Sequence, residues 1–545
     1  MKKNVLALSI AAMIGGLGFA GAASAVVLPG TGALTAATAD KLVLSEGGVG
    51  HMLLVPYYTA QNGNMTVLHV VNTDTKNGKA VKVRFRGAAN SDDVLDFQVF
   101  MSPGDVWTAA VTAGANGIAQ IVTADNTCTV PELKAGVAQS FFTARLNTVL
   151  SAPEKANQTR EGYVEIFNMA DIKPTVASDT VTPSKDLYQA IKHVNSVAPC
   201  SNVAGARTLL DKIATTDFAA EANPEKAAAL AGFDTPTAGL MGDWYIINVP
   251  QTTTFSGAST AVVAVVKSTG ATGRGNFVHF PQSDSEVTGT VGDYTADPLL
   301  RAGSLPVSAS DATVAGTALT VATLKAGNYD LPDMSTPYIT AATTPVLQAA
   351  ALTGALAVKS ITNQYANDAS ITAKTDWVFS MPTRRYSVAA NYAVKTTDPA
   401  YRLFTDLGAV DWFTPANTTV DTAGNICVSA ALQTFYNREE KTPDQVTPGP
   451  VFSPSTPGVK PVVRFCGETS VLSFADAGNS VLAANVARQN LVSGTYENGW
   501  GVIDTANGTA GLPILGATFI KLSNPQAAAG LSGTYGITWP HRFTK

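Results

Sequence analysis

The chain has 545 residues and a formal net charge of -5, and charged residues make up only 14% of it. This mildly acidic balance argues against nucleic acid as a partner. Intrinsic disorder is also excluded, because 46% of the residues are hydrophobic and the net charge is small. The sequence is rich in alanine, threonine, valine and glycine, and threonine and valine pack well on pleated surfaces.

The first predicted element is an export signal at residues 1–25. Lys2 and Lys3 precede an apolar run that ends in Ala23-Ser24-Ala25. This layout is typical of a secretory signal peptide that is cleaved after Ala25. An N-terminal membrane anchor is the alternative, although glycines interrupt the apolar run. We expect no transmembrane segment after cleavage, and a secreted, surface or periplasmic location.

Short alternating segments fill the next block, residues 26–200. Strands are predicted at Met52–Tyr58, Met65–Asn72, Lys79–Arg86, Val94–Met101, Val106–Val111 and Glu161–Met169. Turn signals rich in Gly, Asn, Asp and Pro separate most of them, which is typical of antiparallel sandwiches. The expected fold class is therefore mainly β: an antiparallel β-sandwich, Ig-like or jelly-roll-like, with helical insertions and room for a second β-sandwich block.

The most regular of these segments, KAVKVRFRG, alternates cations with apolar residues. The inward set of this strand is Val81, Val83 and Phe85, and the outward set is Lys82, Arg84 and Arg86. Three acidic residues follow closely and could offset the cations across a hairpin: Asp92, Asp93 and Asp96. The sequence favours a solvated strand face, and contact with an anionic ligand is the alternative.

The same three aspartates are the best metal candidate in the chain. Clustered carboxylates supply the oxygen ligands that Ca²⁺ prefers. No D-x-[DN]-x-[DN]-G motif accompanies Asp92, Asp93 and Asp96, so a solubilising turn is the favoured interpretation and Ca²⁺ is the weaker one. No other cofactor is expected.

The middle block, residues 201–400, is predicted to be mixed. A helix is expected at Ser184–Asn195, just before this block, and further helices are expected within it, from Asn223-Pro224 and from Thr344-Pro345 to about Tyr365. Strands are expected at Asp243–Val249, Ser259–Lys267 and Asp376–Met381. Arg384 and Arg385 form a local cationic pair. A solvated pair is the favoured interpretation, and an acidic glycan or another subunit is the alternative ligand.

The last block, residues 401–545, contains a proline-rich loop at 441–461 that should be extended and exposed. Strands are predicted around Cys427–Tyr436, Val462–Phe474, Gly499–Ile503 and Ile514–Leu522. The four cysteines have no C-x-x-C spacing, so disulfides are favoured over zinc in an exported chain. We predict the sequential pairs Cys128–Cys200 and Cys427–Cys466, with reduced, buried thiols as the alternative.

Several phrases occur together in a fixed order. They are LLVPYYT, KAVKVRFRG..NS.DVLDF.VFMSPGDVWTA, GYVEIFNM, TDWVFSMPTRRY, TFYNREE, FCGETSVLSF and GLPILGATFIKLSN. This set resembles a family of exported proteobacterial proteins described only as hypothetical or cell-surface proteins. The resemblance covers most of the mature chain and implies a secreted surface protein. It implies no activity, substrate or catalytic residue.

The residues offer no catalytic constellation. The five histidines are scattered, and neither a G-x-S-x-G elbow nor a phosphate-binding loop occurs. The six tryptophans are spread along the chain, so packing is favoured over a sugar platform.

We therefore expect an exported, non-enzymatic structural protein of the cell surface, either a self-assembling surface layer or an extracellular-matrix component. Its partners would be further copies of itself or a surface polysaccharide. A secreted glycan-binding, adhesin-like protein is the first alternative, and a secreted hydrolase is the second.

Overall fold

The computed structural model describes residues 26–545 except 175–185, 280, 285–289, 292–306, 310–337, 341–344, 393, 406–411, 431, 441–462, 475–479, 492–496, 507–509 and 529–530. The predicted export signal and the proline-rich loop at 441–461 lie outside the described residues. Within the described ranges the chain is mainly β, with short helices inserted between antiparallel sheets, as the sequence predicts.

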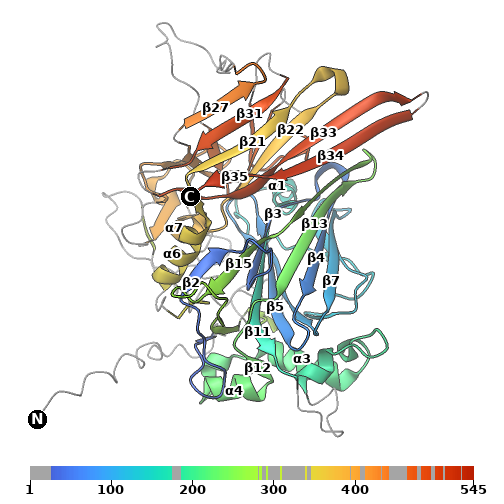
Figure 1. Cartoon of the computed structure of the whole chain (residues 1–545), viewed down its shortest axis with the longest axis vertical. Helices are drawn as coiled ribbons and strands as arrows, with labels where there is room; N and C mark the ends of the chain where they lie inside the picture. Colours follow the sequence, from blue (N-terminus) through green and yellow to red (C-terminus); the bar gives the residue numbers. More distant parts are fainter. Residues whose placement is uncertain are drawn as a thin grey trace, which may run out of the picture.

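Two sheets form an N-terminal sandwich (Figure 1). The first sheet has the strand order β2-β15-β3-β11-β5-β6-β9, with β12 paired to β11, and the second has the order β10-β8-β7-β4-β13-β14. The first-sheet strands are β2 (Lys41–Leu44), β3 (Met52–Thr59), β5 (Gly78–Gly87), β6 (Asp93–Met101), β9 (Cys128–Val130), β11 (Glu161–Ile172), β12 (Phe233–Asp234) and β15 (Thr260–Val265). The second-sheet strands are β4 (Asn64–Asn72), β7 (Val106–Ala113), β8 (Ala119–Val122), β10 (Gln139–Ser140), β13 (Leu240–Asn248) and β14 (Thr253–Ala258).

The predicted hairpin in the first sheet is confirmed. β5 and β6 pair antiparallel, with Val83 opposite Phe97 and Arg84 opposite Asp96. Val83 and Phe97 point into the core between the two sheets, where they join Trp244 of the second sheet. Because side chains alternate along a strand, the charged residues of β5 must point to the other face of the first sheet.

A second sandwich lies at the opposite end of the molecule (Figure 1). Its third sheet has the order β30-β29-β22-β33-β34, in which only the β29–β30 pair is parallel among the described strands, and its fourth sheet has the order β27-β31-β21-β35. Their bounds are β21 (Ser360–Ala366), β22 (Lys374–Ser380), β27 (Leu432–Asn437), β29 (Thr469–Ser473), β30 (Arg488–Asn490), β31 (Asn498–Asp504), β33 (Leu515–Ala528), β34 (Leu531–Pro540) and β35 (Arg542–Thr544). Aromatic residues such as Trp377, Phe435 and Phe474 fill the space between these two sheets.

The two sandwiches share a core. The face of the third sheet that points away from the fourth carries Val378 and Phe519, which belong to the N-terminal core. The Phe519 ring lies 5.5 Å from Phe255, 5.8 Å from Trp244 and 6.4 Å from Tyr57, measured between ring centroids. Residues from all three predicted blocks therefore meet in one hydrophobic core.

Short helices lie at both ends of the first sheet (Figure 1). The helix α1 (Ala152–Gln158) precedes the Glu161 end of β11, whereas α2 (Leu187–Ile191), α3 (Ala204–Thr215) and α4 (Pro224–Leu230) lie at the end where β11 pairs with β12. Single 3-10 turns occur at Gln61–Gly63, Pro199–Ser201, Phe218–Ala220, Ala369–Ile371 and Pro399–Tyr401. Asn223 caps α4 as predicted, because its side chain accepts a hydrogen bond from the Lys226 N–H. Asp186 caps α2 in the same way; the predicted cap, Ser184, lies outside the described residues.

The predicted helix from Thr344-Pro345 to about Tyr365 is too long. Helix α6 spans Pro345–Leu356, and the chain then turns into the strands β20 (Ala357–Val358) and β21. The segment that follows the helix is rich in β-branched residues, which favour a pleated surface, and β21 pairs with both β31 and β35.

Smaller pairs complete the described structure. They involve β1 (Val26–Leu28), β16 (Phe277–His279), β17 (Ser283–Asp284), β18 (Thr290–Val291), β19 (Val307–Ala309), β23 (Val388–Ala390), β24 (Arg402–Thr405), β25 (Thr418–Val420), β26 (Ile426–Ser429), β28 (Arg464–Cys466) and β32 (Leu512–Pro513). The last helix, α7 (Arg384–Ser387), follows β22 and precedes β23.

Candidate functional site: a buried charged layer

The cationic row of β5 does not face solvent. Lys82 and Arg84 are fully buried, and Arg86 is 3% exposed. The prediction of a solvated strand face is therefore wrong. Gln282 and the Arg384–Ser387 helix α7, both distant in sequence, pack their side chains against this face of the first sheet.

Lys82 lies in a closed triangle of polar groups. Its Nζ forms an ion pair with Asp96 and donates to Gln282 Oε1 at 2.9 Å. The Gln282 Nε2 donates in turn to Asp96 Oδ1 at 2.7 Å. All three side chains are buried, so each group's partner is another protein group. Such mutual satisfaction is what burial of a charge requires.

A second group of charges is centred on Glu165 of β11. Its carboxylate lies 3.5 Å from Arg86 Nε and 3.3 Å from Arg385 Nη2. Arg385 Nη1 also donates to Ser91 Oγ at 2.9 Å, which joins α7 to the turn before β6. Next to it, Arg384 Nε lies 2.6 Å from Glu468 Oε2. The prediction of a solvated Arg384-Arg385 pair is thus wrong as well, because both are fully buried.

We call this set the charged layer. It comprises Lys82, Arg84, Arg86, Asp92, Asp93, Asp96, Glu165, Arg384, Arg385 and Glu468. Arg84 belongs to it through position: it is opposite both Asp96 and Glu165 in the strand register, and its guanidinium lies 5.8 Å from the Phe167 ring centre. Sequence reasoning missed Glu165 and Glu468, although GYVEIFNM places a lone acid at an alternating position of an apolar strand.

The three candidate calcium ligands lie inside this layer. Asp92 accepts a 2.7 Å hydrogen bond from the Tyr392 hydroxyl, and burial raises the pKa of its carboxyl to about 7. Burial would also raise the pKa of Asp93, but the Arg86, Arg145 and Arg84 charges outweigh it and lower that pKa. Asp96 pairs with Lys82. The prediction of a solubilising turn is wrong for these buried residues. Their surroundings are cations and hydroxyls rather than an open set of oxygens, which does not fit the weaker Ca²⁺ interpretation.

Two further buried acids lie where the sandwiches meet. Glu161 accepts from Gln61 Nε2 and from the Asn485 N–H, each at 2.8 Å, and burial raises the pKa of its carboxyl to about 7. Asp376 accepts from the Leu482 N–H at 3.0 Å, and burial raises its pKa too. Both acids bind the backbone of the 482–485 segment, so they attach this segment of the last block to strands far from it in sequence.

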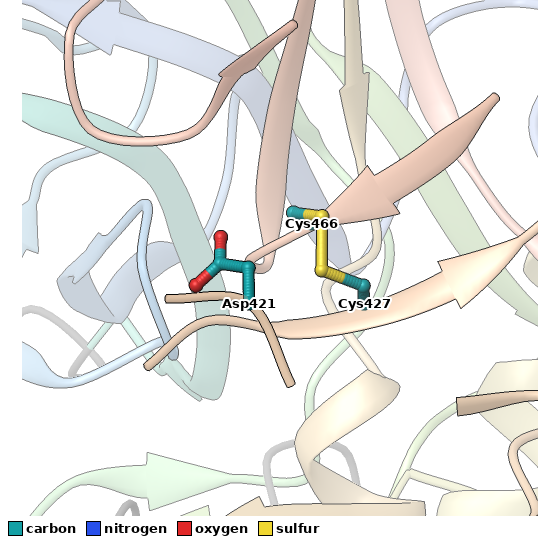
Figure 2. Close-up of side chains that lie close together, drawn as sticks. All are labelled: Asp421, Cys427 and Cys466. Carbon is teal, nitrogen blue, oxygen red and sulfur yellow. A yellow bond between two sulfur atoms is a disulfide. The ribbon is translucent and has the colours of Figure 1, made fainter. Parts of the chain in front are cut away.

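The predicted disulfide pairs are both present. Cys128 is bonded to Cys200, and Cys427 is bonded to Cys466. Asp421 lies beside the second bond (Figure 2), and these three residues are close enough to suggest a metal site. The disulfide removes both thiolates, however, and the Asp421 carboxylate accepts from the Ala423 and Asn425 N–H groups at 2.9 and 2.8 Å. Asp421 therefore closes a turn beside the Cys427–Cys466 disulfide, and the three residues do not offer three free metal ligands.

Aromatic residues divide into packed and exposed sets. Trp107, Trp244, Trp377 and Trp412 are buried, as predicted for core tryptophans. Trp500 and Trp539 are 44% and 43% exposed. On the fourth sheet, the Trp500 ring stacks on Tyr436 of the neighbouring strand, with 4.7 Å between the ring centroids.

The charged layer can hold segments together, because ion pairs link its cations to carboxylates on other segments. Its ion pairs and hydrogen bonds join β5, β6 and β11 to Gln282, α7 and the β28–β29 turn.

Comparison with known proteins assigns neither a family nor a function to this chain. No family model, no characterised protein and no solved structure matches it. Within the described ranges, no helix is long and apolar enough to cross a membrane.

Proposed function

We propose that this chain is an exported structural protein of the bacterial cell surface that assembles with further copies of itself. The observation that carries the proposal is the charged layer. Cations that could bind an outside partner, Lys82, Arg86 and Arg385 among them, are instead bound by the chain's own carboxylates. Such internal ion pairing supports a structural role rather than the binding of an outside ligand.

Two further observations support this role. Both disulfides fit an oxidising compartment outside the cytoplasm, which agrees with the predicted export signal at residues 1–25. Each disulfide also closes a long loop, with sequence separations of 72 and 39 residues. Disulfides that close such loops stabilise a fold mainly by restricting its unfolded state.

Electron microscopy of native cells, labelled for this protein, tests the proposal. We expect label over the outer surface, and release of the protein by gentle extraction of intact cells. The matched control is a chain that lacks residues 2–25, which should stay inside the cell. Label confined to the cell interior with the full chain, together with no release on extraction, would contradict the proposal.

A specific observation also favours a second candidate, a glycan-binding surface protein. The exposed Trp500 and its stacked neighbour Tyr436 present an aromatic surface on the outer face of the fourth sheet. Aromatic surfaces of this kind pack against the apolar faces of sugars. A glycan array should then show binding that Trp500→Ala abolishes and Trp539→Ala leaves unchanged. Equal binding by wild type and Trp500→Ala would remove this candidate.

A further inference from the structure

The second sheet has one face in the core and one face outside. Along β4, Leu68 and Val70 are buried, whereas Val67, His69 and Val71 are partly exposed. The strands β7 and β13 show the same alternation, because successive side chains point to opposite sides of a strand. Figure 1 shows β4, β7 and β13 side by side along one flank of the molecule.

This outer face has an apolar centre although nothing in the described chain buries it. We define it by the outward residues of β4, β7, β8, β13 and β14 (apolar: Met65, Val67, Val71, Val106, Ala110, Val122, Met241, Tyr245, Ile247 and Ala258; polar: His69, Thr108, Thr112, Gln120, Asp243, Thr254 and Ser256). Asp243, which lies opposite His69, is the one carboxylate in this set, and the set contains no lysine or arginine. The solvated face of an antiparallel sheet is normally polar. Contiguous apolar patches on a surface mark interaction sites.

The side chains of the outer face stand in rows across the strands. Tyr245 is opposite Val67, Val67 is opposite Ala110, and Ala110 is opposite Val122. Met241, Val71 and Val106 form a second such row. Rows in register make a pleated surface, and another sheet can pack on such a surface at a distance of about 10 Å.

We propose that this outer face binds the same face of a second copy of the chain. The five strands β8, β7, β4, β13 and β14 contain 4, 8, 9, 9 and 6 residues, 36 in all, and a strand spacing of about 4.8 Å with a rise of about 3.3 Å per residue gives a face of about 570 Å². Two copies would then bury about 1,100 Å², which is above the roughly 1,000 Å² expected of a biological interface. Charge favours this occupant as well. The face carries a single carboxylate, that of Asp243, which lies opposite His69, so it repels its own copy only weakly, whereas an acidic glycan or an anionic lipid surface would require cations that the face lacks.

The inference deepens the proposed function, because it names the surface through which copies assemble. Its test is sedimentation equilibrium of the mature chain, residues 26–545, between about 1 and 100 µM. The test compares wild type with Val67→Lys, at the centre of the face, and with Val149→Lys as the matched control. Val149 is 78% exposed and lies outside the face. Circular dichroism melting checks that each variant is folded.

We expect wild type and Val149→Lys to dimerise with the same Kd, and Val67→Lys to weaken dimerisation by about 100-fold, since a buried like charge on both copies costs several kcal/mol. Tyr245→Lys, at a site that is already 37% exposed, replaces Val67→Lys if the latter does not fold. A monomeric wild type, or equal dimerisation by wild type and a folded face variant, would overturn the inference. So would a monomeric wild type that binds neutral glycan or lipid vesicles through Val67.

The two proposals fail separately. Surface label on native cells, combined with a wild-type dimer that a folded Val67→Lys leaves intact, would leave the proposed function standing and remove this interface. Label confined to the cell interior, combined with a dimer that Val67→Lys disrupts, would do the reverse.

Discussion

Glu165 lies between two guanidinium groups, those of Arg86 and Arg385, and none of the three side chains reaches solvent to a significant extent. In such a place the carboxylate stabilises the fold chiefly by keeping two buried cations compensated. A buried ion pair is no more stabilising than a well-packed apolar pair, but the removal of one partner is expensive. The contribution of the charged layer to the free energy of unfolding therefore becomes measurable when one of its residues is replaced.

We expect Glu165→Gln to lower the free energy of unfolding by about 3–5 kcal/mol, because the two guanidinium groups lose their negative partner in a buried site. Urea denaturation followed by tryptophan fluorescence measures this loss. The control is Asp211→Asn on α3, which removes an ion pair to Arg207 from a half-exposed carboxylate. It should cost less than about 1 kcal/mol. Similar losses in the two variants would contradict this account.

Glu161 predicts a pH dependence. Burial raises the pKa of its carboxyl from 4.5 to about 7 in the folded chain. Between these values the folded state holds a proton that the unfolded state releases, so the free energy of unfolding falls as the pH rises from about 4.5 to about 7. The Glu161 contribution to this fall is on the order of 3 kcal/mol.

The measurement compares the free energy of unfolding at pH 5 and at pH 8 in wild type and in Glu161→Gln. The variant resembles the protonated acid and should lose less stability over this range. Part of the decline should remain, because the pKa of Asp92 is also raised to about 7. Glu221→Gln, at an exposed position, should behave as wild type. An identical decline in Glu161→Gln and wild type would show that Glu161 does not titrate in this window.

At the scale of single elements, β5 separates what a sequence pattern can predict from what it cannot. The bounds of β5, its pairing with β6 and its inward residues Val81, Val83 and Phe85 follow from alternation alone. Whether its other face meets water depends on Gln282, Arg385 and Glu468, which lie far away in the chain. The same alternation of charged and apolar residues fits a solvated face and a covered one.

The contribution of each disulfide to stability can be measured by replacing its two cysteines. Cys128–Cys200 joins β9 to the 3-10 turn before α3 and closes a loop with a sequence separation of 72 residues. Cys128→Ser combined with Cys200→Ser should lower the free energy of unfolding by about 4 kcal/mol. The comparison variant, Cys427→Ser with Cys466→Ser, removes a bond with a sequence separation of 39 residues, and because this loop is shorter the free energy of unfolding should fall slightly less. Peptide mapping without reduction checks the pairing, and any other connectivity would refute the structural assignment.

At the scale of the whole molecule, the third sheet is the link between the two sandwiches. One of its faces packs against the fourth sheet, and the other contributes Val378 and Phe519 to the N-terminal core. Composition and strand spacing predict two β-rich ends. They cannot predict that one sheet serves both cores, because nothing local to β33 indicates that Phe519 contacts Tyr57 and Trp244.

This shared core predicts cooperative unfolding. Phe519→Ala should lower the free energy of unfolding by about 3–5 kcal/mol, as large-to-small changes do at buried aromatic residues. Because both sandwiches use the third sheet, the unfolding curves from far-ultraviolet circular dichroism and from tryptophan fluorescence should shift together as one transition. Trp539→Ala, at a 43% exposed site, is the control and should cost much less. Two transitions, of which only one moves, would contradict a common core.

The residues of the charged layer are also synthesised at very different times. Arg385 lies 294 residues after its partner Ser91, and Tyr392 lies 300 residues after Asp92. A growing chain adds about 5–20 residues per second, so β5 and β6 precede the segments that cover them by tens of seconds. If the β5–β6 hairpin forms during this interval, we expect Lys82, Arg84 and Arg86 to be hydrated and to keep one of its faces compatible with water. The same cations are buried in the folded protein, after the later segments have packed over them.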